Sequence, residues 1–294
     1  MRVRGISPLH EGRRVAGVVR VHRLGPVTQL RLTRTAFGRP LFWVCAHYVD
    51  GLLIGTGCAH TAEEFTAALG EFPVAQVVNT HHHEDHAGGN VSVAARVGHT
   101  VRIHRAGIDR LRHSDQRLLL YRRVVWGAPA PYDPQPLGEQ IVTDHYAFHV
   151  IHVPGYSLDQ VVLFEERMGW VFSADLYLGE RVKYLRRDER LGESLSSLRR
   201  VAALPFEWLF CSHSGVVRGG QQALRAKLAY WETVCRLVEA LRAAGRSPAQ
   251  IHREVLGTEG ALRWISGGDF AKQHLVDEAM KLVTARRQLD AGAA

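Results

Sequence analysis

The sequence predicts a mixed α/β fold that ends in a helical extension, and three observations support this prediction. Short apolar runs typical of strands alternate with helix-like segments between residues 15 and 215. From Gln221 onward, apolar residues recur at spacings of three and four, as in amphipathic helices. No segment reaches the ~20 unbroken apolar residues of a transmembrane helix. We therefore expect an α/β domain over residues 1–220, with a helical extension over residues 221–294 packed on it.

The first half of the chain is expected to be rich in strands. Thr61 precedes a helical segment and is a residue type that often caps a helix N-terminus. A long insertion over residues 105–140 carries an arginine-rich, helix-like run and a proline-rich piece. It could serve as a lid over a substrate or as a cover over a sheet edge, and both readings remain open. We expect strands at 15–21, 29–32, 41–48, 52–54, 74–79 and 100–104, and helices at 62–69 and 91–97.

The second half returns to strands before it becomes helical. With 294 residues and 46% hydrophobic content, the chain can bury one large core and support an appendage. We expect strands at 141–143, 148–153, 160–164, 170–172 and 208–211, and helices at 193–204, 221–243, 248–256 and 269–286.

Charge and cysteine content narrow the choice of partner and compartment. The net charge of +8 comes mostly from arginine pairs such as Arg186-Arg187, with no long basic run. Nucleic acid is therefore a second choice of partner after a small-molecule substrate, and we expect these arginines on solvated faces. The four cysteines lack C-x-x-C spacing, and no apolar core follows the basic N-terminus. This predicts reduced thiols in a cytoplasmic protein that makes no membrane contact.

The densest cluster of metal-binding side chains follows the strand expected at 74–79. Residues 80–90 read T-H-H-H-E-D-H-A-G-G-N, which contains the pattern H-x-H-x-D-H. Imidazole nitrogens and carboxylate oxygens are the ligands that zinc, iron and manganese accept. The small residues that follow suit a tight turn into the next helix. The sequence therefore predicts a metal site at this strand end.

The pattern resembles the metallo-β-lactamase superfamily, and further motifs in the same order carry the resemblance. They are the P-G turn at 153–157, the run V-F-S-A-D-L ending near Asp175, and L-F-C-S-H-S-G around His213. The resemblance implies an αββα sandwich whose helical extension helps to shape the substrate pocket. It also implies a set of metal ligands: His81 and His83 for a first metal, Asp85, His86 and His213 for a second, and Asp175 between the two.

Two positions depart from the family pattern. Gly55 stands where an aspartate is common, and Tyr156 stands where the family has the third histidine of the first site. A phenol binds a metal only after it loses a proton, and its ordinary pKa is about 10. Tyr156 could be a phenolate ligand, a hydroxyl donor to an oxyanion, or a side chain that fills the first site and leaves one metal. His152 is a poor substitute for the missing histidine, because the four residues that separate it from position 156 span about 13 Å in an extended chain.

The resemblance implies a metal-dependent hydrolase that directs a metal-activated water at an ester, thioester, lactone or related small-molecule bond. Asp85 would bind metal and orient the water or accept its proton, and Tyr156 would take part in catalysis. One or two divalent ions are expected, with zinc first and iron or manganese as alternatives. The rivals are a phosphodiesterase or nuclease, and a metal-binding protein of this fold with impaired catalysis.

Overall fold

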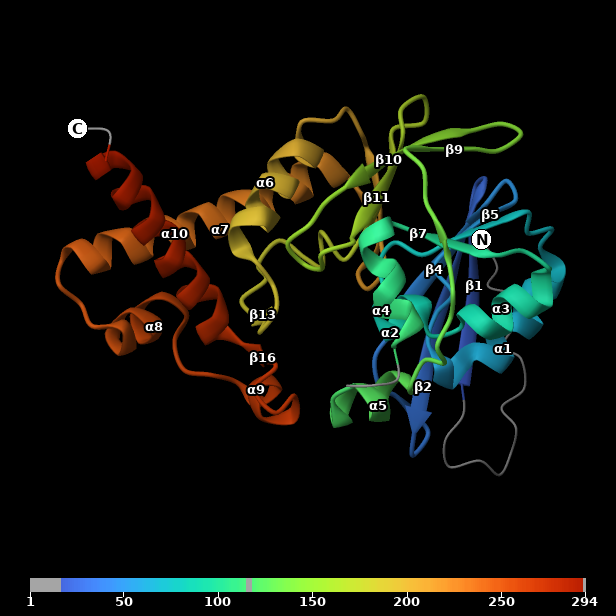
Figure 1. Cartoon of the computed structure of the whole chain (residues 1–294), viewed down its shortest axis with the longest axis horizontal. Helices are drawn as coiled ribbons and strands as arrows, with labels where there is room; N and C mark the ends of the chain where they lie inside the picture. Colours follow the sequence, from blue (N-terminus) through green and yellow to red (C-terminus); the bar gives the residue numbers. More distant parts are fainter. Residues whose placement is uncertain (1–16, 115–117, 293–294) are drawn as a thin grey trace.

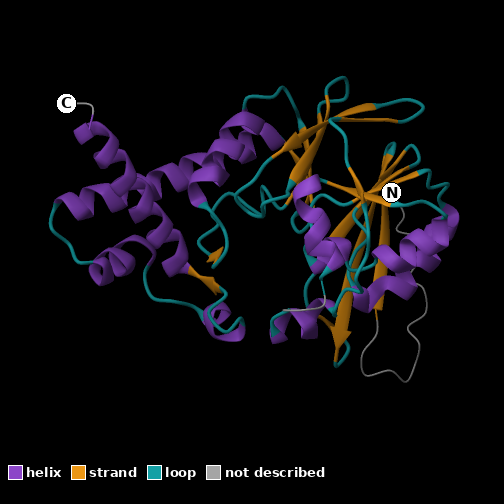
Figure 2. Cartoon of the chain, viewed as in Figure 1, coloured by secondary structure: helices purple, strands orange, loops and turns teal. Residues whose placement is uncertain are grey.

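The computed structural model describes residues 17–114 and 118–292, and it shows two facing sheets with helices on both outer sides (Figure 1, Figure 2). Neighbouring strands of the first sheet follow the order β1 (Gly17–Leu24), β2 (Val27–Ala36), β4 (Val44–Val49), β5 (Leu52–Ile54), β6 (Gln76–Val78), β7 (Val101–Ile103) and β8 (Gln135–Pro136), with β3 (Arg39–Pro40) beside β2. The order in the second sheet is β15 (Gly215–Arg218), β14 (Trp208–Cys211), β12 (Trp170–Ala174), β11 (Val161–Glu165), β10 (Ala147–His152) and β9 (Gln140–Val142).

Alternation along the strands builds separate apolar layers. Leu52 and Ile54 point into the core between the sheets, whereas Leu53 points outward to the core beneath the helices. Phe172 and Phe210 of the second sheet stack between the sheets with ring centroids 4.6 Å apart. The helices over the outer face of the first sheet are α1 (Ala62–Ala68) and α3 (Asn90–Val97). The predicted αββα sandwich is confirmed.

The helices of the C-terminal extension share one apolar cluster with the outer face of the second sheet. α10 packs against α6, α7 and α8, and the extension projects from one side of the sandwich (Figure 1). A short ribbon, β13 (Leu185–Arg186) with β16 (Phe270–Ala271), ties it to the loop after β12. The helices on this side are α6 (Leu191–Ala202), α7 (Gly220–Ala243), α8 (Pro248–Leu256), α9 (Ala261–Ile265) and α10 (Lys272–Gly292). The division at residue 220 stays a prediction.

The structure corrects some local expectations. Thr61 stands at the N-cap of α1 as expected, but its side chain makes no capping bond, because its hydroxyl donates to the Cys58 carbonyl at 3.2 Å. The expected first strand begins at Val15, which lies outside the described residues. Within the described part of the chain, no helix is long and apolar enough to cross a membrane. The sequence did not predict the short helices α2 (Glu84–Ala87) and α4 (Ile108–Arg112), or the 3₁₀ turns Ala59–Thr61, Leu69–Glu71 and Arg105–Gly107.

The insertion behaves as a cover over a sheet edge. Its strand β8 pairs with β7 and closes that end of the first sheet. Its helix α5 (Leu120–Trp126) places Arg122 on Glu84 of the histidine segment. No described residue of 105–140 lines the cavity beside Tyr156 and Asp175, but the Trp126 ring of α5 lies 6.1 Å from the His213 ring, so the lid reading also stays open.

Candidate metal centre

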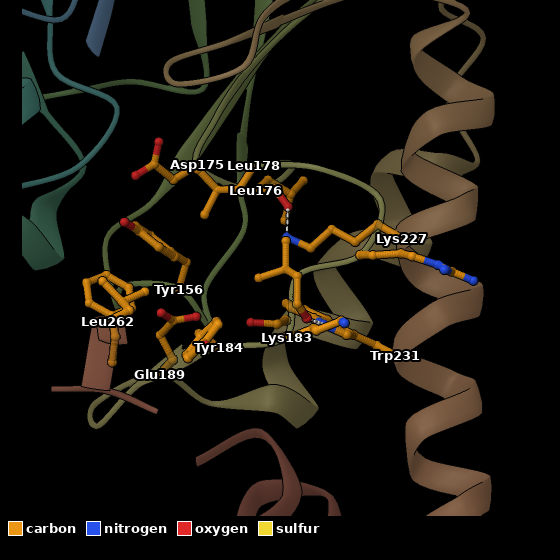
Figure 3. A pocket seen from close by; sticks show the side chains of 14 residues that line it. Tyr156, Asp175, Leu176, Leu178, Lys183, Tyr184, Glu189, Lys227, Trp231 and Leu262 are labelled. Carbon is orange, nitrogen blue, oxygen red and sulfur yellow. Dashed lines mark hydrogen bonds between the residues drawn. The ribbon is translucent and has the colours of Figure 1, made fainter. Parts of the chain in front are cut away.

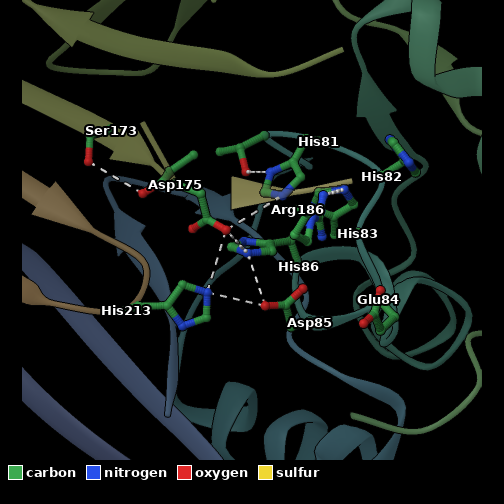
Figure 4. Close-up of polar contacts among 12 residues, drawn as sticks. His81, His82, His83, Glu84, Asp85, His86, Ser173, Asp175, Arg186 and His213 are labelled. Carbon is green, nitrogen blue, oxygen red and sulfur yellow. Dashed lines mark hydrogen bonds and ion pairs between the residues drawn. The ribbon is translucent and has the colours of Figure 1, made fainter. Parts of the chain in front are cut away.

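Loops that follow three strands bring the predicted ligands together (Figure 4). The histidine segment follows β6 of the first sheet, while Asp175 and His213 follow β12 and β14 of the second. Because β12 and β14 run parallel, their carboxyl ends reach the same edge. The site therefore lies where the two sheets meet.

The spacing of one ligand set fits a tetrahedral metal. Potential ligand atoms of Asp85, His86, Asp175 and His213 all lie within 4.8 Å of one another. The two histidine Nε2 atoms lie 3.4 and 3.2 Å from Asp85 Oδ2, and 3.3 and 3.5 Å from Asp175 Oδ2. Ligands ~2.1 Å from a tetrahedral ion are roughly 3.4 Å apart. These four histidine–aspartate distances therefore match those expected around a zinc-sized ion.

Several buried polar atoms of this ligand set make no hydrogen bond. His86 Nε2 and both carboxylate oxygens of Asp175 are buried without a hydrogen bond. Buried polar atoms are rarely left in that condition, because desolvation without a partner costs free energy. His213 donates from Nδ1 to the Trp43 carbonyl at 2.8 Å, which leaves Nε2 directed at the carboxylates. The donor set is therefore arranged for a cation.

An irregular strand end aims Asp175. Ala174 has φ 47°, a left-handed conformation that residues with a Cβ rarely adopt. The register between β12 and β14 shifts between Phe172 and Ala174. Just beyond, buried Lys227 donates from Nζ to the Leu176 carbonyl at 2.6 Å. Strain of this kind persists where the surroundings impose it, so the packing fixes the direction of Asp175.

Buried polar contacts fix the histidine segment from beneath. The His86 carbonyl accepts hydrogen bonds from the Thr56 backbone at 2.8 Å, the Thr56 hydroxyl at 3.1 Å and the Asn79 amide at 3.0 Å. A Cβ at Gly89 would lie 2.2 Å from the Thr56 carbonyl oxygen. The predicted small-residue turn thus has a packing reason: only glycine allows this approach.

Without a metal, protons on the two histidines of this set balance the negative charge of the two aspartates. Burial opposes protonation of His86, yet Asp85 and Asp175 outweigh it and raise the pKa of His86 to about 10. The pKa of His213 also rises well above its ordinary value, because Asp175 overcomes the effect of burial. Burial would raise the pKa values of both aspartates, but the two histidines lower them well below 3.8. A divalent ion would replace the protons of the two imidazoles.

The first-site residues are also close together, but in a different environment. His81, His83 and Asp175 offer ligand atoms within 4.8 Å of one another. Burial keeps the pKa values of both histidines well below 6.5. The Tyr156 ring packs 5.4 Å from the His81 ring and 5.2 Å from the His83 ring. Burial and the charge of Asp175 hold the pKa of its phenol well above 10. Without a metal, the Tyr156 phenol therefore keeps its proton and can donate a hydrogen bond.

A buried arginine joins this group. Arg186 is 3% exposed, and its Nη2 lies 2.6 Å from His83 Nε2 (Figure 4). Its guanidinium lies over the Tyr156 ring, 4.9 Å from the centroid. The expectation that this arginine pair lies on a solvated face is wrong for Arg186, while Arg187 is exposed.

A cavity of about 360 Å³ adjoins the site (Figure 3). Tyr156 and Asp175 line it on the side of the metal ligands, and leucines, Val182, Trp231 and Phe270 supply much of the apolar wall. Burial lowers the pKa of Lys227 to about 8 and raises that of Glu189 to about 7. The size suits a small molecule.

Comparison with known proteins identifies the family. The sequence profile of the metallo-beta-lactamase superfamily matches residues 49–213, more than half of the chain. The chain belongs to the metallo-beta-lactamase superfamily.

Relatives within this superfamily include two hydroxyacylglutathione hydrolases. The one from Rhodospirillum rubrum is 26% identical over 183 residues, which is 59% of this chain and 62% of that protein. The one from Aeromonas hydrophila is 28% identical over 186 residues, 62% of this chain and 64% of that protein. The chain thus spans just under two thirds of the length of these relatives. A metallo-beta-lactamase family protein from Thermus thermophilus has a TM-score of 0.64 over 90% of this chain and 94% of that chain, at 19% identity, and it shows the shared fold.

Other polar residues around the superfamily motifs have structural roles. His82 and Glu84, for which the sequence predicts no ligand role, make buried contacts: His82 Nδ1 lies 2.7 Å from Asp159 Oδ1, and Glu84 pairs with Arg122. His152 points elsewhere and lies 2.9 Å from the Leu158 carbonyl oxygen. The sequence did not indicate Arg186 and Lys227 as residues of the site, because a single arginine or lysine carries no local signal of burial.

Proposed function

We propose that the chain is a metal-dependent hydrolase that cleaves a small-molecule ester, thioester or lactone, with a thioester as the favoured substrate. The observation that carries this proposal is the tetrahedral ligand set beside a cavity of small-molecule size. Asp175 belongs to both, so a ligand in the cavity reaches the metal-binding atoms. Zinc is the proposed ion, with iron and manganese as alternatives.

In this proposal, the metal, Asp85 and Tyr156 have different roles in hydrolysis. When bound, a divalent ion supplies Lewis acidity and lowers the pKa of water toward ~7. Asp85 stays ionised beside His86 and His213 and can orient water or accept its proton. The Tyr156 hydroxyl remains a donor at the cavity wall and can stabilise an oxyanion. The geometry therefore supports attack of water on a carbonyl carbon.

Two further facts favour a thioester with a charged group. The relatives named hydroxyacylglutathione hydrolases act on thioesters, as their name states. Three basic residues line the cavity, namely Arg181, Lys183 and Lys227. Its two acidic residues are Glu189 and Asp175, and Asp175 belongs to the metal-ligand set. Cationic linings attract anionic ligands. We therefore favour a small acyl thioester that carries negative charge. We place the reaction in the cytoplasm, because Cys45, Cys58 and Cys211 are buried thiols that form no disulfide.

The test is thiol release from a hydroxyacylglutathione by purified, zinc-loaded protein, in parallel with a simple ester and a lactone. Asp85→Asn should lower turnover by at least ~10²-fold, because it removes both a ligand charge and a proton acceptor. His149→Ala, an exposed strand histidine away from the site, is the matched control and should keep full turnover. Metal-loaded wild type that hydrolyses none of the three substrates would refute the proposal and leave a metal-binding protein with impaired catalysis.

A phosphodiesterase or nuclease is the second candidate, because the net charge is +8. Binding to phosphate backbones weakens steeply as salt rises. Tight binding of a labelled oligonucleotide at low salt, with such a slope, would favour this candidate. No binding at low salt would remove it.

A further inference from the structure

We propose that the Arg186 guanidinium takes the place of a first metal ion, so that this chain binds a single metal at the Asp85, His86, Asp175 and His213 set. The inference rests on the proposed metal centre and adds its stoichiometry. It starts from one contact: Arg186 Nη2 lies 2.6 Å from His83 Nε2, at the edge of the first-site group.

This contact leaves neither nitrogen of His83 able to bind a metal, although it involves Nε2 alone. A guanidinium only donates hydrogen bonds, so His83 Nε2 must accept from it. Since Nε2 then uses its lone pair, the proton of the neutral imidazole lies on Nδ1. A protonated nitrogen cannot bind a metal. If Nε2 were the ligand instead, a metal would need to lie ~2.1 Å from it, where the arginine nitrogen already stands.

The remaining first-site groups do not make up the loss. The third position presents the Tyr156 ring, which packs against the guanidinium at 4.9 Å, in place of an imidazole nitrogen. That leaves His81 and Asp175, whose nearest ligand atoms are 3.8 Å apart. Two protein ligands next to a fixed positive charge are a poor site for a dication, because structural and catalytic zinc sites use three or four.

The structure holds Arg186 firmly in this position. Arg186 pairs with Phe270 in the ribbon between β13 and β16, and its backbone N–H donates to Glu189 Oε1 at 2.9 Å. Its Nε lies 3.6 Å from Asp188 Oδ1 and 3.8 Å from Glu189 Oε1. A second cation, Arg122, forms an ion pair with Glu84 directly beside His83. Two parts of the chain, residues 185–189 and β16, thus hold the Arg186 cation at the first site.

The first experiment measures metal content by elemental mass spectrometry, on full-length wild type loaded with excess zinc and then desalted. Anomalous diffraction at the zinc edge locates the ion. One zinc per chain at the Asp85, His86, Asp175 and His213 set is the expected result. Two zinc ions, or one zinc at His81 and His83, would overturn the inference while the proposed hydrolase survives. No zinc after loading would remove both.

Variants then ask whether Arg186 is the cause. The double substitution Arg186→Met with Tyr156→His removes the cation and restores a histidine, and it should raise the zinc content to two per chain. Arg187→Met, a neighbouring exposed arginine, is the matched control and should stay at one. A folded double variant that still binds one zinc would contradict the inference. If the double variant fails to fold, the wild-type stoichiometry and the anomalous map still decide.

Discussion

His213 approaches the ligand set with one ring nitrogen already engaged. Its Nδ1 donates to the Trp43 carbonyl, so the ring cannot rotate without losing that bond. Outer partners of this kind set the tautomer and orientation of metal-binding histidines. His213 itself follows β14 of the second sheet, whereas the carbonyl that holds its ring belongs to Trp43, directly before β4 of the first sheet.

We expect His213→Ala to weaken zinc binding by at least ~10²-fold, because one of the four ligands is lost. A competition titration with a chromophoric chelator measures the affinity. His149→Ala, at an exposed position of β10, should leave the affinity unchanged. An unchanged affinity in His213→Ala would mean that the metal lies elsewhere.

Lys227 is buried at the wall of the cavity, where its ammonium donates to the Leu176 carbonyl and lies 4.3 Å from the Trp231 ring centroid. Lys227→Met keeps the volume but leaves that carbonyl unpaired, so the free energy of unfolding should fall by about 1–3 kcal/mol. Denaturant titration measures it. Lys183→Met, at an exposed lysine of the same cavity, should change KM for an anionic substrate but not the stability. Equal stability losses in both variants would contradict this account.

At the scale of elements, the start of α10 depends on a residue from the loop between α8 and α9. Glu259 accepts hydrogen bonds from the backbone of Lys272 at 3.1 Å and Gln273 at 2.8 Å. These are the first N–H groups of the helix, which lack partners within it. Because β16 directly precedes α10, this cap also fixes the strand that pairs with β13.

Glu259→Ala should lower the free energy of unfolding by about 1–2 kcal/mol, as loss of a helix cap does. It should also speed amide hydrogen exchange in β13 and β16. Ser247→Ala removes the capping box of α8 and is the matched control, with a similar loss of stability but no effect on that ribbon. Protection in β13 and β16 that matches wild type would show that the ribbon does not depend on this cap.

What the sequence could predict follows from the range of the interactions involved. Most strands of the sandwich and helices α6 to α8 were predictable, because each has its own apolar period. The short edge strands β3, β8 and β15 were not predicted. The ligand set was predictable as far as each member sits in a short motif such as H-x-H-x-D-H, although its roles as metal ligands remain predictions. Arg186 was not predictable, because its burial depends on a pairing with Phe270 more than eighty residues away.

Viewed as a whole, the molecule carries a histidine at the centre of the sandwich. His47 is 3% exposed and packs edge-on against the stacked rings of Phe172 and Phe210, with ring centroids 5.5 and 5.7 Å away. Its Nε2 lies 3.2 Å from the Gln29 side-chain amide. Burial lowers its pKa from 6.5 to about 3. Between these two pH values the unfolded chain binds a proton here and the folded chain does not, so acid favours unfolding.

This group alone should remove roughly 4–5 kcal/mol of stability as pH falls from 6.5 to about 3. In metal-free protein, His47→Gln should therefore lose less stability than wild type over that interval, although it is less stable near neutral pH. Denaturant titrations at a series of pH values measure the difference. The same change at exposed His149 is the control, and parallel curves for wild type and His47→Gln would contradict the prediction.

The ribbon of β13 and β16 gives the C-terminal extension an influence beyond its contribution to the core. It holds the arginine that, in our proposal, limits the centre to one metal, although the extension supplies no metal ligand among the described residues. Replacing this tail with one that lacks β16 would remove the strand that positions Arg186, while Arg186 itself stays in the chain. A chimera could gain or lose a metal ion with every coordinating residue unchanged.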